Sequence, residues 1–296
     1  MDLKTPRVSI GVPVRNGERF LAEALDSLLA QTFTDFELLI SDNASSDQTE
    51  AIGRDYAAKD KRVRYYRCPQ DVGLANNFNY LFLRSRGAYF KWAAGDDVHD
   101  PDYVARCVKV LDQDPTTVLA YGKARFIDQD GNPLDTSDPG FDLRSEAPED
   151  RIRYVIRAYH WVNAIFGVVR REALANTQLL PSYAGADYTL LGELAAAGKF
   201  VEVPDSLFRR RLHPAASSQN RSGEAWMVQF WTGSGGISLP LWSRSRDHFG
   251  TILRADVKTS RKIGLIATLA RSMVWRRRSL AKELRAASLH KLHPKS

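Results

Sequence analysis

Acidic side chains follow two apolar segments of the chain, at places that could bind a charged ligand. Residues 36–40 lead into Asp42, and residues 89–94 lead into Asp96 and Asp97. If these segments are buried strands of an open α/β sheet, the carboxylates lie where such sheets bind ligands. Two adjacent carboxylates suit a divalent cation, and a cation held this way suits a substrate that carries phosphates. The pattern favours a nucleotide-dependent enzyme.

A histidine preceded by three arginines is a second candidate. Arg209, Arg210 and Arg211 lead into His213, at the end of a strand predicted over 207–212. A neutral imidazole can complete a mixed nitrogen and oxygen metal shell, and guanidinium groups can pair with phosphate oxygens. The alternative interpretation is a basic edge strand.

Asp187 and Asp42 each have both a chemical and a structural interpretation. Asp187 opens a helix predicted over 187–197, so it either caps that helix or acts as a general base toward a hydroxyl. The helix N-terminus would lower its pKa and keep it ionised. Asp42 either accepts a hydrogen bond from a nucleobase or ribose hydroxyl, or forms an Asx-turn. Asp47 is expected to cap the following helix.

Strand and helix patterns alternate along the first two thirds of the chain. The predicted strands cover residues 8–14, 36–40, 63–67, 89–94, 118–126, 164–169, 200–203 and 207–212. The predicted helices cover residues 21–30, 46–58, 74–83, 151–159 and 187–197, with another starting at 101. This alternation predicts an α/β fold, with a mostly parallel sheet flanked by helices.

Two segments lack such periodicity. Residues 135–150 hold two prolines and six acidic residues, which predicts a mobile surface loop that is either a plain connector or a lid. Residues 232–236 are rich in glycine but lack the spacing of a phosphate-binding loop. They are expected to form a flexible joint.

The chain is long enough for one large domain, or for one domain with an appendage. Its net charge of +7 arises in the C-terminal part, where residues 254–296 hold twelve Lys or Arg against two acidic residues. Two cysteines, Cys68 and Cys107, give no disulfide framework and predict a reducing compartment. No apolar signal core or spanning segment is evident. We expect a cytoplasmic protein with a catalytic domain over 1–225 and a basic helical extension over 226–296.

The extension carries an apolar stripe from Ile263 to Val274, followed at once by three arginines at 276–278. This arrangement suits either peripheral binding to an anionic membrane surface, at its inner face, or packing on the catalytic domain with a solvated basic face. No aromatic interleaving supports nucleic acid as a partner.

Taken together, these residues resemble an inverting glycosyltransferase of family 2 with the GT-A fold, over roughly residues 7–218. The resemblance rests on the strand and turn at 8–16, the Leu-Leu-Ala-Gln-Thr segment with its following Glu37, and the Asp-x-x-Ser-x-Asp-x-Thr stretch at 42–49. It continues in Gly73 to Asn77, in Gly95-Asp96-Asp97, and in the Arg211, His213 and Ser218 pattern.

The resemblance implies a Rossmann-like GT-A sheet and a UDP-, GDP- or dTDP-linked sugar donor. It places donor contacts at Pro13, Val14, Asn16, Glu18, Asp42, Asn77, Asp96 and Arg211. It implies Mn²⁺ or Mg²⁺ held by Asp97 and His213, because Gly95 replaces the first acid of Asp-x-Asp, and it makes Asp187 the base. The acceptor would be a saccharide or a lipid-linked molecule, in polysaccharide or glycolipid assembly.

Departures from the family pattern refine this expectation. Arg15 stands where an aromatic residue usually lines the base pocket, and the Gln-x-x-Arg-Trp sequence of processive members is absent. The absence of the Gln-x-x-Arg-Trp sequence points to transfer of one sugar per encounter. Two alternatives stay open: a sugar nucleotidyltransferase, although its Gly-rich loop with a downstream lysine is missing near 11–17, and a non-catalytic sugar-nucleotide-binding relative, if Asp187 is only a cap.

Overall fold

The computed structural model describes residues 5–136, 138, 140–158, 163–214, 216, 224–234 and 237–292. Its strands are β1 (Val8–Val14), β2 (Phe36–Asp42), β3 (Val63–Arg67), β4 (Tyr89–Trp92), β5 (Val98–His99), β6 (Thr117–Ile127), β7 (Val168–Arg170) and β8 (Lys199–Arg211). Its helices are α1 (Leu21–Leu29), α2 (Thr49–Lys59), α3 (Leu74–Arg84), α4 (Tyr103–Gln113), α5 (Pro148–Arg157), η1 (Asn163–Phe166), α6 (Arg171–Ala175), α7 (Ala186–Ala197), α8 (Glu224–Thr232), α9 (Pro240–Arg254), α10 (Thr259–Trp275) and α11 (Arg277–Leu292).

The strands form one sheet in the order β3-β2-β1-β4-β7-β6-β8-β5. The β3-β2-β1-β4 half is parallel throughout, and β6 is parallel to β8. Only β7 and β5 run antiparallel to their neighbours. The mostly parallel α/β sheet predicted from the alternating pattern is therefore confirmed.

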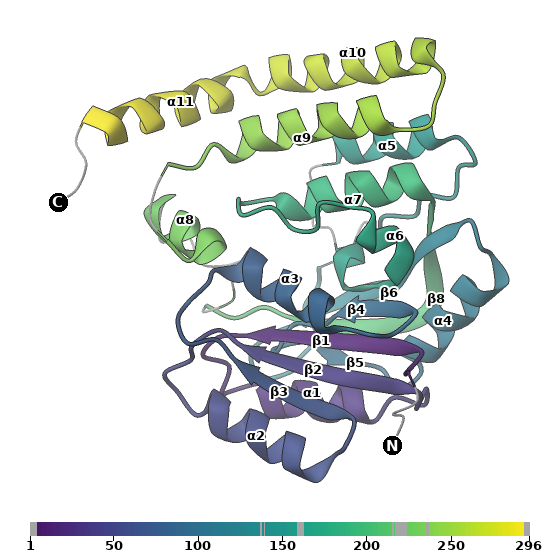
Figure 1. Ribbon diagram of the computed structural model, residues 1–296, viewed down its shortest axis with the longest axis vertical. Helices are drawn as coiled ribbons and strands as arrows, with labels where there is room; N and C mark the ends of the chain where they lie inside the picture. Colours follow the sequence, from purple (N-terminus) through teal and green to yellow (C-terminus); the bar gives the residue numbers. More distant parts are fainter. Residues whose placement is uncertain are drawn as a thin grey trace.

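Alternate side chains of β2, β4 and β7 enter two different apolar clusters, as the pleat requires. Ile10 and Leu38 pack with Leu25 of α1 and Val104 of α4 on one face. Phe90 and Trp92 pack on the other face with residues of α3 and α7. Because helices cover both faces of the sheet (Figure 1), the open carboxyl ends of the strands are left as the place for a ligand site.

Several sequence expectations were wrong in detail. Residues 163–166 form the 3₁₀ helix η1, so the strand expected over 164–169 shrinks to β7. The two strands expected over 200–203 and 207–212 are one irregular strand, β8, with a register shift opposite Gly122 and Lys123. The two-residue strand β5 was not expected.

The loop expected to be mobile is packed in its described part. Phe141 and Leu143 are buried in the core, and Leu143 bridges to Phe200 of β8. The carboxylate of Asp138 accepts a hydrogen bond from the backbone N–H of Ala124. This favours a connector over a lid. Residues 137 and 139, Tyr159 at the end of the helix expected over 151–159, and Gly235 and Gly236 of the expected joint lie outside the described residues.

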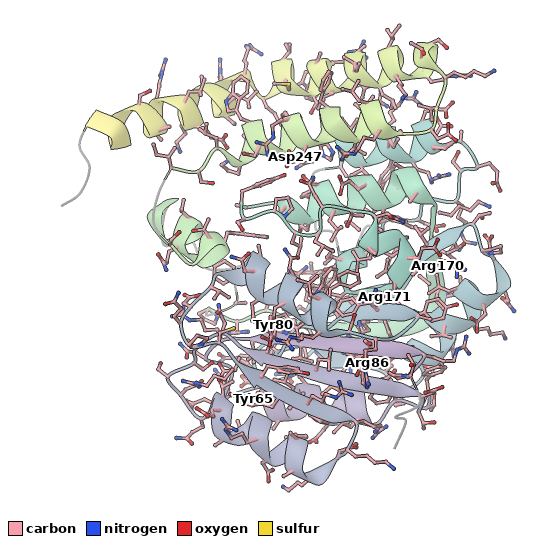
Figure 2. All side chains as sticks on the ribbon, in the orientation of Figure 1. Tyr65, Tyr80, Arg86, Arg170, Arg171 and Asp247 are labelled. Atoms are coloured by element: carbon pink, nitrogen blue, oxygen red, sulfur yellow. The ribbon has the colours of Figure 1, made fainter. Side chains whose placement is uncertain are left out.

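Helices α9 and α10 pack against the α/β part of the chain rather than standing apart from it. Ile252 of α9 and Leu265 and Leu269 of α10 form an apolar cluster with Ile152 and Ile156 of α5. In Figure 2, Asp247 lies on α9 where it faces α7, and it accepts a 2.7 Å hydrogen bond from Tyr183, just before α7. In the described part of the chain, no helix combines the length and apolarity needed to cross a bilayer.

Helix α8, which precedes α9 in the chain, packs against α3. The contact is a close backbone approach between Gly73 and Gly233, both of which have positive φ. A Cβ on Gly73 would lie 2.3 Å from the Gly233 nitrogen, and a Cβ on Gly233 would lie 2.5 Å from the Gly73 nitrogen. Only glycine fits at either position.

Candidate active site

A cavity of about 440 Å³ lies at the carboxyl ends of β1, β2 and β4. Six of the residues named from the sequence line it: Pro13, Val14, Asn16, Asn77, Asp96 and His213. They come from the first strand, the turn after it, α3, the loop after β4 and the segment after β8. The fold therefore brings together residues that are up to two hundred positions apart in the chain.

Asp96 and His213 form a pair at the wall of this cavity. Asp96 Oδ2 lies 3.0 Å from His213 Nε2, and the imidazole packs on the Phe20 ring with centroids 4.8 Å apart. A carboxylate and an imidazole form a mixed oxygen and nitrogen donor set that suits Mn²⁺. Within the described residues no group of three His, Cys, Asp or Glu is placed to hold a metal.

Asp97 is directed away from the cavity, in contrast to the expectation that it is the principal metal ligand. Its side chain is 3% exposed, and Oδ1 accepts a 2.9 Å hydrogen bond from the backbone N–H of Arg211. Burial, followed by the neighbouring Asp96 charge, raises the pKa of Asp97 to about 8. The geometry favours Asp96 as the ligand and Asp97 as the residue that ties β8 to this loop.

The three arginines before His213 are engaged within the protein. Arg209 pairs with Asp100, and Arg210 donates to Asn163. Arg211 is 3% exposed and donates to Glu23 and to the backbone oxygen of Asp96. Arg211, expected to contact the donor, instead holds the loop that carries Asp96 in place.

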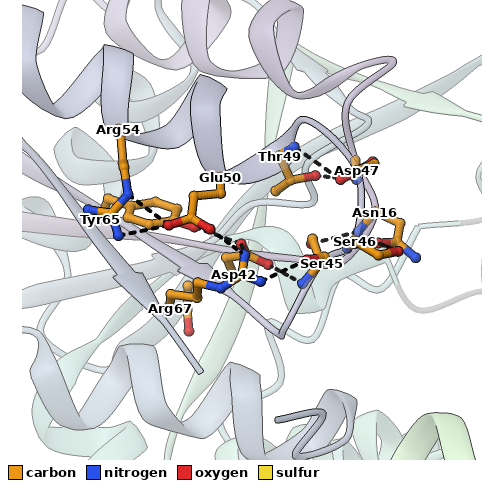
Figure 3. A network of polar contacts seen from close by, with 12 residues as sticks. Asn16, Asp42, Ser45, Ser46, Asp47, Thr49, Glu50, Arg54, Tyr65 and Arg67 are labelled. Carbon is orange, nitrogen blue, oxygen red and sulfur yellow. Dashed lines mark hydrogen bonds and ion pairs between the residues drawn. The ribbon is translucent and has the colours of Figure 1, made fainter. Parts of the chain in front are cut away.

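Asp42 is the centre of a buried network at the end of β2 (Figure 3). Its Oδ2 accepts hydrogen bonds from Tyr65 at 2.6 Å and Arg67 at 2.9 Å, and its Oδ1 accepts from the Ser45 N–H at 2.8 Å. Asp42 is fully buried and is not among the residues that line the cavity. In this geometry it shapes the loop after β2, as the Asx-turn interpretation allowed.

Glu18 has a similar role in the neighbouring turn. Its carboxylate accepts a hydrogen bond from the Gln48 N–H, while its own N–H donates to Asp47. Asp47 also accepts from the Thr49 N–H in the first turn of α2, as expected of a residue that satisfies a helix N-terminus. These bonds join the turn after β1 to the start of α2, which holds Asn16 at the cavity with a φ of 52°.

Three polar residues at the cavity were not identified as site residues from the sequence. Asp71 accepts a 2.7 Å hydrogen bond from Asn43 and lies 3.3 Å from an Arg15 guanidinium nitrogen. All three side chains line the cavity. Arg15 was noted only as a departure from the family pattern, and Asp71 sits in a short polar segment before α3 without a motif of its own. Phe78 of α3 and Phe230 of α8 also line this cavity.

Asp187 occupies the first turn of α7, after Gly185 in a left-handed conformation. It is half-buried, and its Oδ1 accepts a hydrogen bond from the Tyr188 N–H at 3.0 Å. Burial raises the pKa of Asp187, and Arg244 and Arg210 oppose that shift without cancelling it. The expectation of a lowered pKa was therefore wrong, because desolvation outweighs the helix N-terminus.

Asp187 is not part of the wall of the first cavity, but the turn just before it opens on a second one. This cavity of about 520 Å³ lies between that turn, the start of α9 and the junction of α10 and α11. Gly185, Leu241, Arg244 and Arg276 line it. Asp187 thus belongs to the side of the molecule that the C-terminal helices cover.

The chain was compared with protein families, with curated proteins and with solved structures. The model of the family described as Glycosyl transferase family 2 matches residues 9–172. An uncharacterized glycosyltransferase of Rickettsia typhi is 34% identical over 44% of this chain, and a chondroitin synthase of Escherichia coli is 32% identical over 44%. The aligned parts make up 40% and 19% of those two proteins, so the chain spans less than half of their length.

Solved structures show the same fold at low sequence identity. TarS of S. aureus in complex with UDP-GlcNAc has a TM-score of 0.69 at 18% identity, over 90% of this chain and 72% of that one. The mannosyltransferase PcManGT of Pyrobaculum calidifontis, in complex with GDP-Man and Mn²⁺, has a TM-score of 0.55 at 16% identity, over 99% and 88%. The fold is the GT-A fold of such neighbours, and since the family's model covers more than half of its length, this chain belongs to glycosyltransferase family 2.

Proposed function

We propose that this protein transfers one sugar per encounter from a nucleotide-diphosphate donor to a hydroxyl group, with inversion of the anomeric configuration. The observation that carries the proposal is the Asp96–His213 pair, which lines a cavity at the carboxyl ends of parallel strands. Family membership supports glycosyl transfer as the reaction class.

The donor nucleotide would occupy the cavity with its base toward Arg15, Asn43 and Asp71. This polar trio offers both hydrogen-bond donors and acceptors, so it suits a UDP-, GDP- or dTDP-linked sugar. The diphosphate would lie toward Asp96 and His213, which would hold Mn²⁺ or Mg²⁺. The cation would neutralise negative charge on the leaving diphosphate.

Asp187 would act as the general base. Its carboxylate takes the proton from the acceptor hydroxyl while that oxygen bonds to the anomeric carbon, and the bond from this carbon to the diphosphate oxygen breaks on the opposite side. A raised pKa suits this role, because a base with a pKa nearer to the working pH accepts a proton more readily. The acceptor would be a saccharide or a lipid-linked saccharide, in assembly of a cell-surface polysaccharide or glycolipid.

A panel of sugar nucleotides tests the proposal. With Mn²⁺ present, we expect slow hydrolysis of a preferred donor, release of its nucleoside diphosphate and suppression of the reaction by EDTA. A nucleotidyltransferase would instead consume a nucleoside triphosphate and a sugar 1-phosphate and release pyrophosphate. Binding of a donor with no turnover in any acceptor screen would support the non-catalytic alternative.

A His213→Ala variant is expected to weaken metal affinity by about 10–100-fold, as for the loss of a supporting interaction at a metal site. The reason is the 3.0 Å contact between Nε2 and the Asp96 carboxylate. Titration of Mn²⁺ in the presence of UDP measures the effect. An unchanged titration curve would remove His213 from the site.

The pH dependence of turnover should reflect the ionisation of Asp187. The base must be ionised to accept a proton, so kcat is lost as the pH falls through its pKa. Because burial raises that pKa, the acid limb should have its midpoint above the ordinary aspartate value of about 3.9. A kcat profile recorded at saturating donor, acceptor and metal checks this, and a limb at or below the ordinary value would contradict it.

A further inference from the structure

Helix α10 has two apolar faces, and only one of them is covered. Leu265 and Leu269 are buried in the cluster shared with α5 and α9, and Ile266 and Met273 pack against the same cluster. The apolar stripe noted in the sequence is therefore divided between two faces. Ile263 and Val274 do not join the covered face and are 64% and 59% exposed.

The uncovered face forms a continuous line along α10. Ile263, Ala267, Ala270 and Val274 are all exposed, and their spacing of four, three and four residues puts them on one side of an α-helix. This side is opposite the buried Leu265 and Leu269. Figure 1 shows α10 and α11 along one edge of the molecule, where α10 packs on α9 and α5.

Basic and aromatic side chains border this line. Arg271 is exposed beside it, and Trp275 at the end of α10 is 85% exposed. Helix α11 continues the same edge with exposed Arg277, Arg278, Lys282 and Arg285. Within the described part of the chain, none of these five cations forms an ion pair with an acidic side chain. The apolar line, Trp275 and these five cations are termed the α10–α11 surface.

We propose that the α10–α11 surface docks on the face of an anionic lipid bilayer. A narrow apolar line can enter the boundary between headgroups and acyl chains while neighbouring cations bind anionic headgroups. An amphipathic indole at the edge of the line is typical of that boundary. This inference rests on the C-terminal helices and not on the reaction proposed above.

The charge pattern argues against the two other classes of partner. In a symmetric dimer, the same five cations of both copies would face one another and repel. A nucleic acid would match the charge, but it would leave the apolar line in water, and Trp275 is the one aromatic side chain of this surface available for base stacking. An anionic bilayer both pairs with the five cations and removes the apolar line from water.

Point substitutions are the appropriate test, because removal of α10 would expose the cluster that it shares with Ile152 and Ile156 of α5. The full chain is sedimented with vesicles of phosphatidylcholine alone or with added phosphatidylglycerol. We expect binding to the anionic vesicles that weakens as NaCl is raised. Arg277→Gln with Arg278→Gln should weaken it about tenfold or more, and Trp275→Ser roughly tenfold.

Matched variants on other surfaces control for these changes. Lys61→Gln with Lys109→Gln removes the same charge from exposed positions elsewhere, and Leu83→Ser removes a 69% exposed apolar side chain from α3. Both should bind as the parent does, with unchanged thermal unfolding.

Three results would overturn the proposal. One is equal recovery in the supernatant with and without anionic vesicles at low salt. Another is equal weakening by the control variants, which would indicate attraction by overall charge. The third is that the parent forms a concentration-dependent dimer, or binds an RNA oligonucleotide. This result counts against the proposal if Trp275→Ser abolishes that association but leaves vesicle binding unchanged.

Discussion

An Asp187→Asn variant should bind the nucleotide-sugar donor with near-normal affinity and turn it over about 10²–10⁴-fold more slowly. Asparagine keeps the size of the side chain and an oxygen that can accept the Tyr188 N–H, as Asp187 does at 3.0 Å. It cannot accept a proton. Single-turnover rates at saturating donor and acceptor, together with donor titrations, separate the two effects.

Glu193→Gln provides a matched control for this prediction. Glu193 lies on the same helix, and its carboxylate accepts the Gln178 N–H and pairs with Arg254. Neutralising it should leave the rate unchanged, because it takes no part in the proposed reaction. If Asp187→Asn instead lost donor binding and kept its rate per bound complex, Asp187 would be a structural residue of the α7 N-terminus.

An Asp96→Ala variant should lose metal-dependent donor binding, with Mn²⁺ affinity reduced by more than about 100-fold. This exceeds the 10–100-fold cost of losing a supporting residue, because Asp96 supplies the only carboxylate next to His213 among the described residues that line the cavity. Mn²⁺ and donor titrations measure both losses. The fold should survive, since Asp96 is partly exposed at the cavity wall.

Asp97→Asn is the informative comparison. The oxygen of the asparagine can still accept the Arg211 N–H, and loss of the charge is expected to cost little because burial disfavours the ionised form of Asp97 and raises its pKa. We expect donor binding within about tenfold of the parent. The reverse outcome, with Asp97→Asn inactive and Asp96→Ala active, would restore Asp97 as the metal ligand.

The sequence predicted the elements of the parallel half well, since their periodicity is set by burial. The strand at 63–67 and the first strand match the structure residue for residue. The errors lie where tertiary contacts override the local pattern. Residues 164–166 are apolar, yet they belong to a 3₁₀ helix before β7, and residues 141 and 143 of an acidic loop are buried in the core.

The candidate site was predictable in composition but not in orientation. Adjacent aspartates have the same local signal, and only the fold determines that Asp96 faces the cavity while Asp97 bonds to the backbone of β8. The same holds for Asp42, whose partners Tyr65 and Arg67 lie on the neighbouring strand. No short motif could have identified the trio of Arg15, Asn43 and Asp71, because these residues come into contact only when their separate turns fold.

The paired glycines at 73 and 233 have a consequence for how this protein can be recombined with its relatives. The family match ends at residue 172, yet Phe230, just before Gly233, supplies part of the wall of the first cavity. A chimera that joined this catalytic part to a foreign C-terminal segment would therefore inherit an altered pocket. Because a side chain at either glycine would collide with the backbone of the other, such an exchange succeeds only when glycine is present at both positions.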